Sequence, residues 1–241
     1  MESIGIPIDS SRKAISEALK STASSIWLEL RNIFKLEAYV KSVEGDKIIL
    51  AGASLKLAKP GFIFEIETGN GTGYVRITGY NKAEWTVIAN ERPSAYDIAI
   101  EYPRLPMYVG LGALMFSDLF GIGFSVWSDG SGDIPLPIYI GGGTLLGHVG
   151  SYTPLYATLG LGVKLLELER IGAMTNGGVG IIGLIDFIAV DFLFGAFGMF
   201  ADGLVTYEFT PKFGIYGSFG YNLYLGTTGP TGIALQLGVY F

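Results

Sequence analysis

Apolar and non-apolar positions alternate strictly along residues 231–241. Ile233, Leu235, Leu237, Val239 and Phe241 fall on one side of the pattern, and small or polar residues and Tyr240 fall on the other. Successive side chains of a strand point to opposite faces, so this segment predicts a strand with one wholly apolar face. A strand that crosses a membrane in a barrel needs this arrangement, because its outer face meets lipid and its inner face meets the lumen. A strand of a soluble sandwich is the alternative.

The same alternation recurs in the preceding part of the chain. It predicts strands over 107–116, 120–127, 134–146, 155–165, 199–209 and 213–225, with the start of the third one uncertain because Pro135 and Pro137 cannot donate to a ladder. The connecting segments, among them 129–133, 147–153, 167–176 and 226–230, are predicted to be loops.

Residues 179–200 allow two interpretations. Their length and hydropathy fit a transmembrane helix, but Asp186 and Asp191 interrupt them, and a central Asp costs about 2.5–3.5 kcal/mol in such a helix. We therefore prefer two strands, near 177–186 and 192–209, which turn around Asp186–Asp191. The second of these includes the segment 199–209, so the predicted strands of residues 105–241 number eight.

Eight antiparallel strands of this length would form a transmembrane β-barrel with a narrow, filled interior, and their even number would place both ends of the barrel segment on the periplasmic side. The last strand would close the barrel by pairing with residues 109–115. In architecture and in its terminal aromatic strand, this part resembles the small OmpA/OmpX-type outer-membrane barrels. The resemblance implies that Tyr240 and Phe241 form a terminal signal for the outer-membrane assembly machinery.

The first part of the chain has a different pattern. Residues 1–35 are predicted to hold an amphipathic helix, because apolar residues recur at three- and four-residue spacing from residue 12 to about residue 34. It is expected to pack on its own domain; a membrane-surface or partner-binding helix is the alternative. Short strands with Gly- and Asp-containing turns follow over 36–104 and predict a small soluble barrel. They are expected at 37–43, 47–51, 62–67, 74–78, 85–89 and 96–100.

Residues 37–102 carry a recognisable series of short motifs. Val40 to Leu50 follows V-x-x-V-x-G-D-x-I-x-L, and a Lys59-Pro60-Gly61 turn and a Phe64-Glu65-Ile66 strand come next. The series resembles the small β-barrel module at the C-terminus of the flagellar assembly protein T family. This resemblance implies a periplasmic docking module without an activity of its own.

Composition separates the two parts. Residues 1–106 hold 13 basic and 13 acidic residues, whereas the remainder holds 3 basic and 9 acidic residues and 28 of the 36 glycines. Two prolines in residues 101–106 indicate a stiff connector. No secretory signal is visible at the N-terminus, so we expect a signal peptide in the precursor, with this sequence as a mature form that carries an added Met.

The residues offer little catalytic chemistry. The only histidine, His148, lies in a predicted loop without a nucleophile motif, no Cys is present, and no cluster has metal-ligand spacing, so we expect neither an enzyme nor a cofactor. The acidic barrel part excludes a nucleic-acid footprint. Lys164, Asp202 and Glu208 are predicted to face the lumen, either as a charged constriction or as a buried ion-pair network. The other acidic residues, including Asp129 and Glu167, are expected to be solvated loop charges, and Trp127, Tyr152, Tyr156, Tyr216 and Tyr224 to lie at the membrane interface or in the lumen.

The sequence as a whole predicts a mainly β protein in the bacterial outer membrane. Its barrel would contact membrane lipids and anchor the periplasmic domain of residues 1–104, which would dock to an envelope partner or to a second copy. A small porin for ions or solutes is the alternative function.

Overall fold

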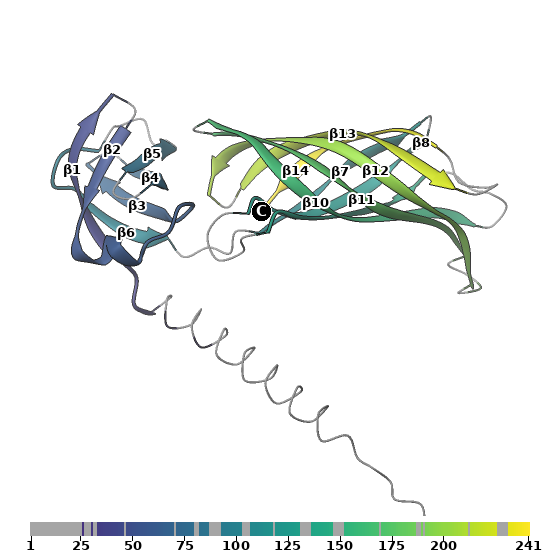
Figure 1. Cartoon of the computed structure of the whole chain (residues 1–241), viewed down its shortest axis with the longest axis horizontal. Coiled ribbons are helices and arrows are strands. Elements are labelled where there is room, and N and C mark those ends of the chain that lie inside the picture. The colour runs from purple at the N-terminus through teal and green to yellow at the C-terminus, as the bar shows by residue number, and fades with distance from the viewer. Residues whose placement is uncertain are drawn as a thin grey trace, which may run out of the picture.

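The computed structural model contains two closed barrels joined end to end (Figure 1). It describes residues 26, 30, 33–45, 47–69, 71–79, 82–86, 93–102, 107–117, 119–130, 136–146, 152–168, 170–186, 189, 191–211, 213–225 and 231–241. Of the predicted N-terminal segment 1–35, residues 26, 30 and 33 are helical and residues 34 and 35 are not. The remainder lies outside the described residues, so that helix stays a prediction. Among the described residues, no helix is long and apolar enough to cross a membrane.

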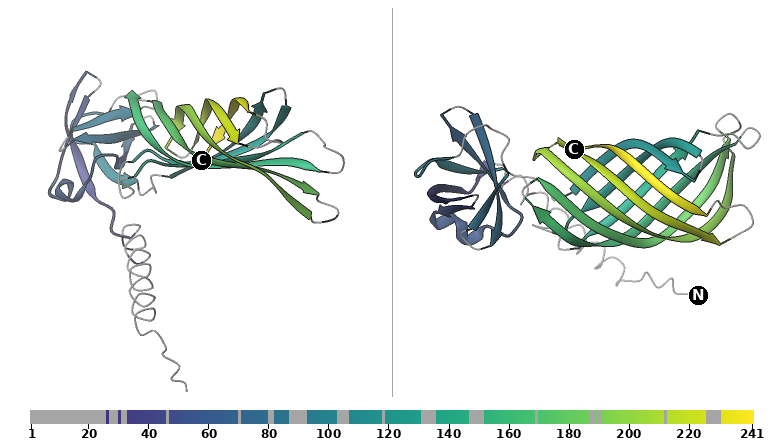
Figure 2. Two further views of the ribbon diagram at one scale, coloured as in Figure 1. Left: turned by 45° about the vertical axis from the view of Figure 1, so that its right-hand side comes forward. Right: turned by 90° about the horizontal axis from the view of Figure 1, so that it is seen from above.

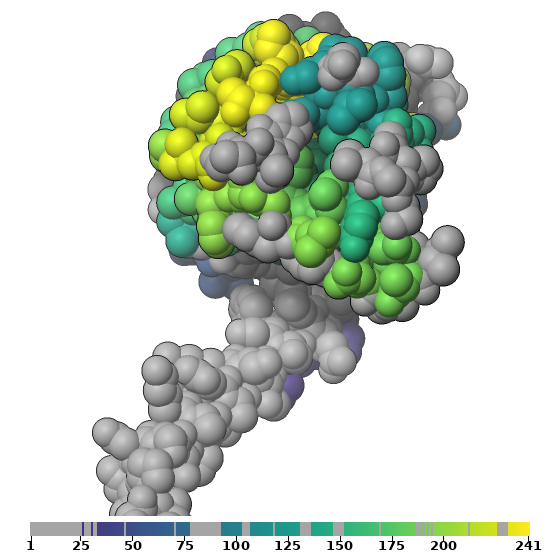
Figure 3. All heavy atoms as spheres, turned by 90° about the vertical axis from the view of Figure 1, so that its right-hand side faces the viewer, coloured from purple at the N-terminus to yellow at the C-terminus, as the bar shows by residue number. Residues whose placement is uncertain are grey.

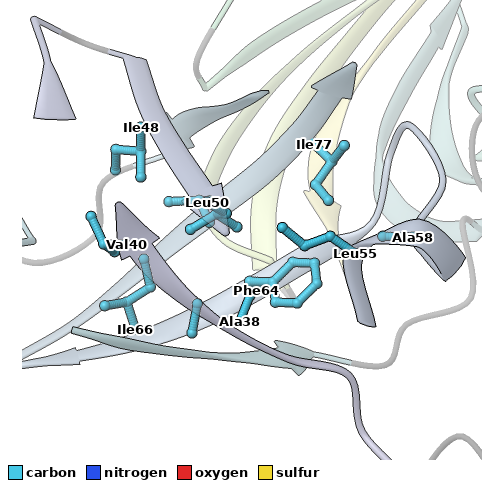
Figure 4. Packing of buried hydrophobic residues seen from close by; sticks show 11 residues of the cluster. Ala38, Val40, Ile48, Leu50, Leu55, Ala58, Phe64, Ile66 and Ile77 are labelled. Atoms are coloured by element: carbon cyan, nitrogen blue, oxygen red, sulfur yellow. The ribbon is translucent and has the colours of Figure 1, made fainter. Parts of the chain in front are cut away.

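The small barrel has six antiparallel strands in the order β1-β2-β5-β4-β3-β6. Their bounds are β1 Glu37–Glu44, β2 Lys47–Ala51, β3 Ile63–Thr68, β4 Gly71–Gly79, β5 Lys82–Thr86 and β6 Ile98–Tyr102, with a 3₁₀ helix, η1, at Ala53–Leu57. Alternate residues of these strands meet inside the barrel, where Val40, Leu50, Phe64 and Ile66 are almost fully buried (Figure 4). Three predicted segments are displaced. β4 already begins at Gly71 within the expected glycine turn, and the strand expected over 85–89 is β5, which begins at Lys82. The strand expected over 96–100 is β6, which begins at Ile98 because Tyr96 lies in a turn.

The large barrel has eight antiparallel strands in the order β10-β11-β12-β13-β14-β7-β8-β9. Their bounds are β7 Met107–Phe116, β8 Leu119–Ser128, β9 Ile138–Leu145, β10 Thr153–Leu168, β11 Ile171–Asp186, β12 Asp191–Thr210, β13 Phe213–Leu225 and β14 Gly232–Tyr240. The barrel closes where β14 pairs with β7, from Ala234 opposite Phe116 to Tyr240 opposite Gly110, which confirms the predicted closing strand. Figure 3 looks onto the end remote from the small barrel, where the last strands (yellow) lie beside the first two (teal).

Residues 171–210 form the longest hairpin of the chain. β11 and β12 pair from Ile171 opposite Tyr207 to Asp186 opposite Asp191. The predicted turn at Asp186–Asp191 is therefore confirmed, and the helical alternative for 179–200 is wrong. The loop expected at 167–176 is also wrong: β10 continues to Leu168, and β11 begins at Ile171. The polar residues that suggested a loop there include Asn176, which is buried on the inner face of β11.

The two faces of the large barrel differ as the alternation predicts. Every strand exposes large apolar side chains on its outer face; one from each strand, in chain order, is Leu111, Ile122, Ile140, Leu161, Val179, Val205, Leu223 and Leu237. Among the described strand residues from 107 onward, each charged residue lies either on the inner face or at a strand end. The strands tilt around the barrel axis (Figure 2), and the end that carries Phe241 faces the small barrel.

Candidate functional site

Aromatic side chains fill the lumen next to the small barrel. Tyr108 stacks on Trp127 with ring centroids 5.4 Å apart, and Trp127 also contacts Tyr216 and Tyr240 at 5.3 and 5.4 Å. Trp127, Tyr216 and Tyr240 are no more than 2% exposed. The first two of these, with Tyr156 and Tyr224, are thus inside the barrel and not at a membrane interface.

A second apolar layer fills the lumen nearer the far end. Phe116 lies between Tyr156 and Tyr224, with both ring centroids 6.2 Å away. Glycines on the inner faces make room for the aromatic rings: a Cβ added at Gly110 would lie 2.6 Å from Cε1 of Tyr216. Such close approach needs a residue without a side chain. The glycine content of this half thus serves interior packing.

Polar side chains form a hydrogen-bonded layer between the two aromatic layers. Ser125 Oγ donates to Gln236 Oε1 (3.1 Å), Gln236 Nε2 donates to the Tyr216 hydroxyl (2.5 Å), and Asn176 Nδ2 donates to Asp202 Oδ1 (2.7 Å). The cavity beside Asp202 measures only about 20 Å³, which is room for roughly one water molecule. Buried polar groups that bond to one another in this way rigidify an interior.

Charged side chains gather at the mouth that faces the small barrel. The Lys164 ammonium lies 3.3 Å from Asp129 Oδ2 and 2.6 Å from Glu167 Oε2. Glu208, from the neighbouring region of β12, is buried at the same mouth. Lys164 therefore pairs with two carboxylates, and Arg170 lines the same mouth as these residues and Glu208.

The small barrel supplies a further cation to the mouth. Arg76 extends from the outer face of β4 into the mouth, where its Nη1 lies 2.8 Å from Glu167 Oε1 and its Nη2 pairs with Glu208 Oε2. Burial acts to lower the pKa of Arg76, but the charge of Glu208, with smaller contributions from Tyr108 and Glu167, outweighs it and raises the pKa. The guanidinium is therefore permanently charged and holds carboxylates from two strands. We call Arg76, Glu167 and Glu208 the latch.

Ile63 is buried beside Arg76 on the outer face of the small barrel. It pairs with Arg76 on β4 and with Tyr102 on β6, which places it on the outer face of the small barrel. It is nevertheless only 5% exposed and does not belong to the core cluster inside that barrel.

A β-bulge in β10 brings Glu167 into the mouth. The register against β11 shifts between Lys164 and Leu166, so Leu165 and Leu166 both point outward. Without the shift, simple alternation would place Lys164 inside and Glu167 outside. The bulge returns Glu167 to the inner side, next to Lys164, which is a common use of an extra residue in a strand.

The structure places the three predicted lumen charges in two different surroundings. Lys164 and Glu208 belong to the ion-pair network at the mouth, whereas Asp202 lies deeper and bonds to Asn176. Asp129 and Glu167 were wrongly expected to be solvated loop charges. His148 lies outside the described residues. Tyr152 lies near the far end, where its hydroxyl donates to Asp191 Oδ2 (3.0 Å).

Sequence reasoning missed Arg76. It occupies an outward position of a short strand, where a basic residue is ordinarily a solvated surface charge. The signal available in the sequence was the charge imbalance, because the second part of the chain holds nine acidic and only three basic residues.

Phe241 lies on the outside of the large barrel, at the end that faces the small barrel. Its ring centroid is 5.8 Å from that of Phe213.

The fold and its interior define a closed eight-stranded barrel with a filled lumen and a docked cap. No family model matches the chain, and no curated protein matches it. The solved structures that resemble this chain include Neisserial surface protein A (14% identity, TM-score 0.38), a major outer membrane protein from Thermus thermophilus (15%, 0.40) and Ail, the attachment invasion locus protein of Yersinia pestis (12%, 0.36). Each match covers 56% of this chain and 96–98% of the other.

Proposed function

We propose that this chain is a structural outer-membrane protein whose large barrel crosses the bilayer and anchors the small barrel, as a docking module, on the periplasmic side. The single observation that carries this proposal is the latch, because it joins the module to the mouth of a barrel whose outer face suits lipid. An anchor needs a membrane part, a presented part and a fixed connection between the two.

The outer face of the large barrel supports membrane insertion. A belt of exposed apolar side chains without charges is costly in water but favourable in a bilayer. At the module end, Tyr207, Phe209, Phe213 and Phe241 contact one another in sequence along the outer surface, with centroid distances of 5.1–5.8 Å. Aromatic girdles of this kind lie at membrane–water interfaces. The bilayer would then end beside the latch, with the module outside it.

Two properties of the proposed anchor remain predictions. Tyr240 and Phe241 are the expected signal for the outer-membrane assembly machinery. The module is expected to bind an envelope partner or a second copy, in keeping with its resemblance to the flagellar module. Neither expectation involves catalysis, and we propose no enzymatic activity.

The filled lumen favours an anchor over the porin alternative. We expect the purified protein, inserted in planar bilayers, to leave the conductance indistinguishable from that of the bare bilayer. The reason is that two aromatic layers and the docked module close the path. Insertion of a folded barrel is controlled separately, by the shift of gel mobility on boiling measured on the reconstituted protein. Discrete openings of the unmodified protein would contradict the anchor and support the porin.

A further inference from the structure

The face of the small barrel opposite the latch is apolar and exposed. In the closed strand order, β1 lies diametrically across from β4, so its outer face points away from the large barrel (Figure 1). Tyr39 on this face stands directly opposite Ile98 of β6, and Ile100 follows two residues later. Their exposed fractions are 44%, 62% and 38%. With Tyr96, these residues form what we call the distal face.

Tyr96 is held on the distal face at a conformational cost. Its φ is +78°, a region that bulky residues rarely adopt, and its side chain is 81% exposed. Three contacts fix the turn: Tyr96 N donates to Val40 O (2.7 Å), Val40 N to Asp97 O (2.9 Å) and Ser94 N to Asp97 Oδ2 (2.7 Å). An exposed aromatic ring in a strained backbone conformation contributes nothing to the core. Such strain concentrates where a side chain must be presented to a ligand.

A second uncovered apolar surface precedes β1. Ile26, Leu30 and Ile33 are helical, are spaced by four and three residues, and are 51%, 41% and 71% exposed. The sequence continues this spacing upstream through Thr22, Leu19 and Ile15. Residues at this spacing share one face of a helix. The helix therefore would carry an apolar stripe that its own chain leaves uncovered at the described positions.

The charges of the two surfaces are complementary. Residues 10–35 hold five basic and two acidic residues. On the module, Glu37 and Glu65 flank Ile100 on the two neighbouring strands, and Glu67 follows on β3, against one base, Lys41, beyond Tyr39. The basic amphipathic helix predicted from the sequence would fit an apolar face with an acidic rim, because charges at the rim orient the contact.

We propose that the distal face binds the N-terminal segment, residues 10–35, of a second copy of this chain. The inference rests on the proposed role of the small barrel as a docking module, and it names the partner. The segment of the same chain is a poor candidate, because its described apolar residues and the distal face remain exposed together. Exchange between copies would cover both surfaces at once and link anchored barrels on the periplasmic side.

Cross-linking between singly substituted chains tests the proposal. Because the chain contains no cysteine, each variant carries a single reactive thiol. Full-length Ile98→Cys and Leu30→Cys proteins, purified in detergent and mixed, are expected to give an interchain cross-link at twice the mass of one chain. Cross-linking of Leu30→Cys to itself alone would indicate helix-to-helix pairing and overturn the proposal. A chain that carries both Ile98→Cys and Leu30→Cys and cross-links only within itself would also overturn the proposal. The absence of any cross-link would overturn it as well.

Variants of the distal face separate binding from folding. Ile98→Glu is expected to weaken self-association by about tenfold or more, whereas Leu57→Glu, an equally exposed apolar site on η1, leaves it unchanged. Tyr96→Gly removes the strained side chain, so the fold should be kept while association weakens in the same way. Light scattering in detergent gives the mass of the assembly. Unchanged association in both distal-face variants would overturn the proposal. The shift of gel mobility on boiling reports separately whether the large barrel is folded. A failure of the proposed anchor can therefore be told apart from a failure of self-association.

Discussion

Arg76→Ala is expected to release the small module from the mouth of the large barrel and to destabilise the docked state by roughly 3–5 kcal/mol. The side chains of Arg76 and Glu208 are only 12% and 8% exposed. Removing the guanidinium would take a close cation away from the buried Glu208, and the loss of a paired charge around a buried carboxylate is strongly destabilising. The effect is large because one residue satisfies carboxylates from two strands.

The distance between the two barrels measures this release. Spin labels at Glu67→Cys on the module and Leu168→Cys on β10 should give a narrow distance distribution in the unmodified background and a broad one with Arg76→Ala. Both positions are exposed and lie outside the latch. Arg76→Met combined with Glu167→Gln and Glu208→Gln should recover much of the stability, since buried ion pairs can be replaced by neutral groups of similar size. An unchanged distribution in Arg76→Ala would show that the latch does not hold the module.

Leu161→Arg is expected to cost about 2–4 kcal/mol of folding stability in lipid, whereas Leu168→Arg on the same strand should cost roughly 0–1 kcal/mol. The two leucines have similar exposed fractions, 61% and 55%. Leu161 lies near the middle of β10 and Leu168 at its end beside the module. Only the depth in a bilayer distinguishes them, because a charge at the midplane loses its hydration and one at the interface keeps it.

Urea unfolding of both variants in lipid vesicles gives the two costs. Leu161→Gln serves as a control for the loss of apolar packing without a charge. Equal costs for the two arginine variants would mean that both sites face water, and the membrane assignment of the large barrel would then be wrong.

Much of the large barrel could be predicted because its physical requirements are periodic. An outer face without charges and an inner face packed into the lumen impose a two-residue period, and exposed positions alternate with less exposed ones along most of Met107–Phe116 and Phe213–Leu225. The turn at Asp186–Asp191 could be placed because two aspartates interrupt an apolar run. Closure between β14 and β7 followed from the even number of strands.

The mouth could not be predicted, because it depends on departures from that period. The bulge near Leu165 reverses the alternation of inward and outward positions just before Glu167. The sequence pattern that follows therefore resembled that of a loop. The latch joins residues 91 and 132 positions apart in the chain, through an arginine that any local pattern assigns to the surface. Asp202 and Glu208 both lie on β12 and face the lumen. Asp202 bonds to Asn176 and Glu208 to Arg76, and only the three-dimensional structure shows this difference.

Accessibility along the outer face tests the central claim, a lipid-embedded large barrel with the module outside the bilayer. A fluorophore placed in turn at Leu161, Leu223 and Leu237, and at Lys41 and Glu67 of the module, can be quenched by brominated lipid or by aqueous iodide. We predict that brominated lipid quenches the three barrel positions and that iodide quenches only the two module positions. Iodide quenching of the barrel positions as strong as that of the module would contradict the account.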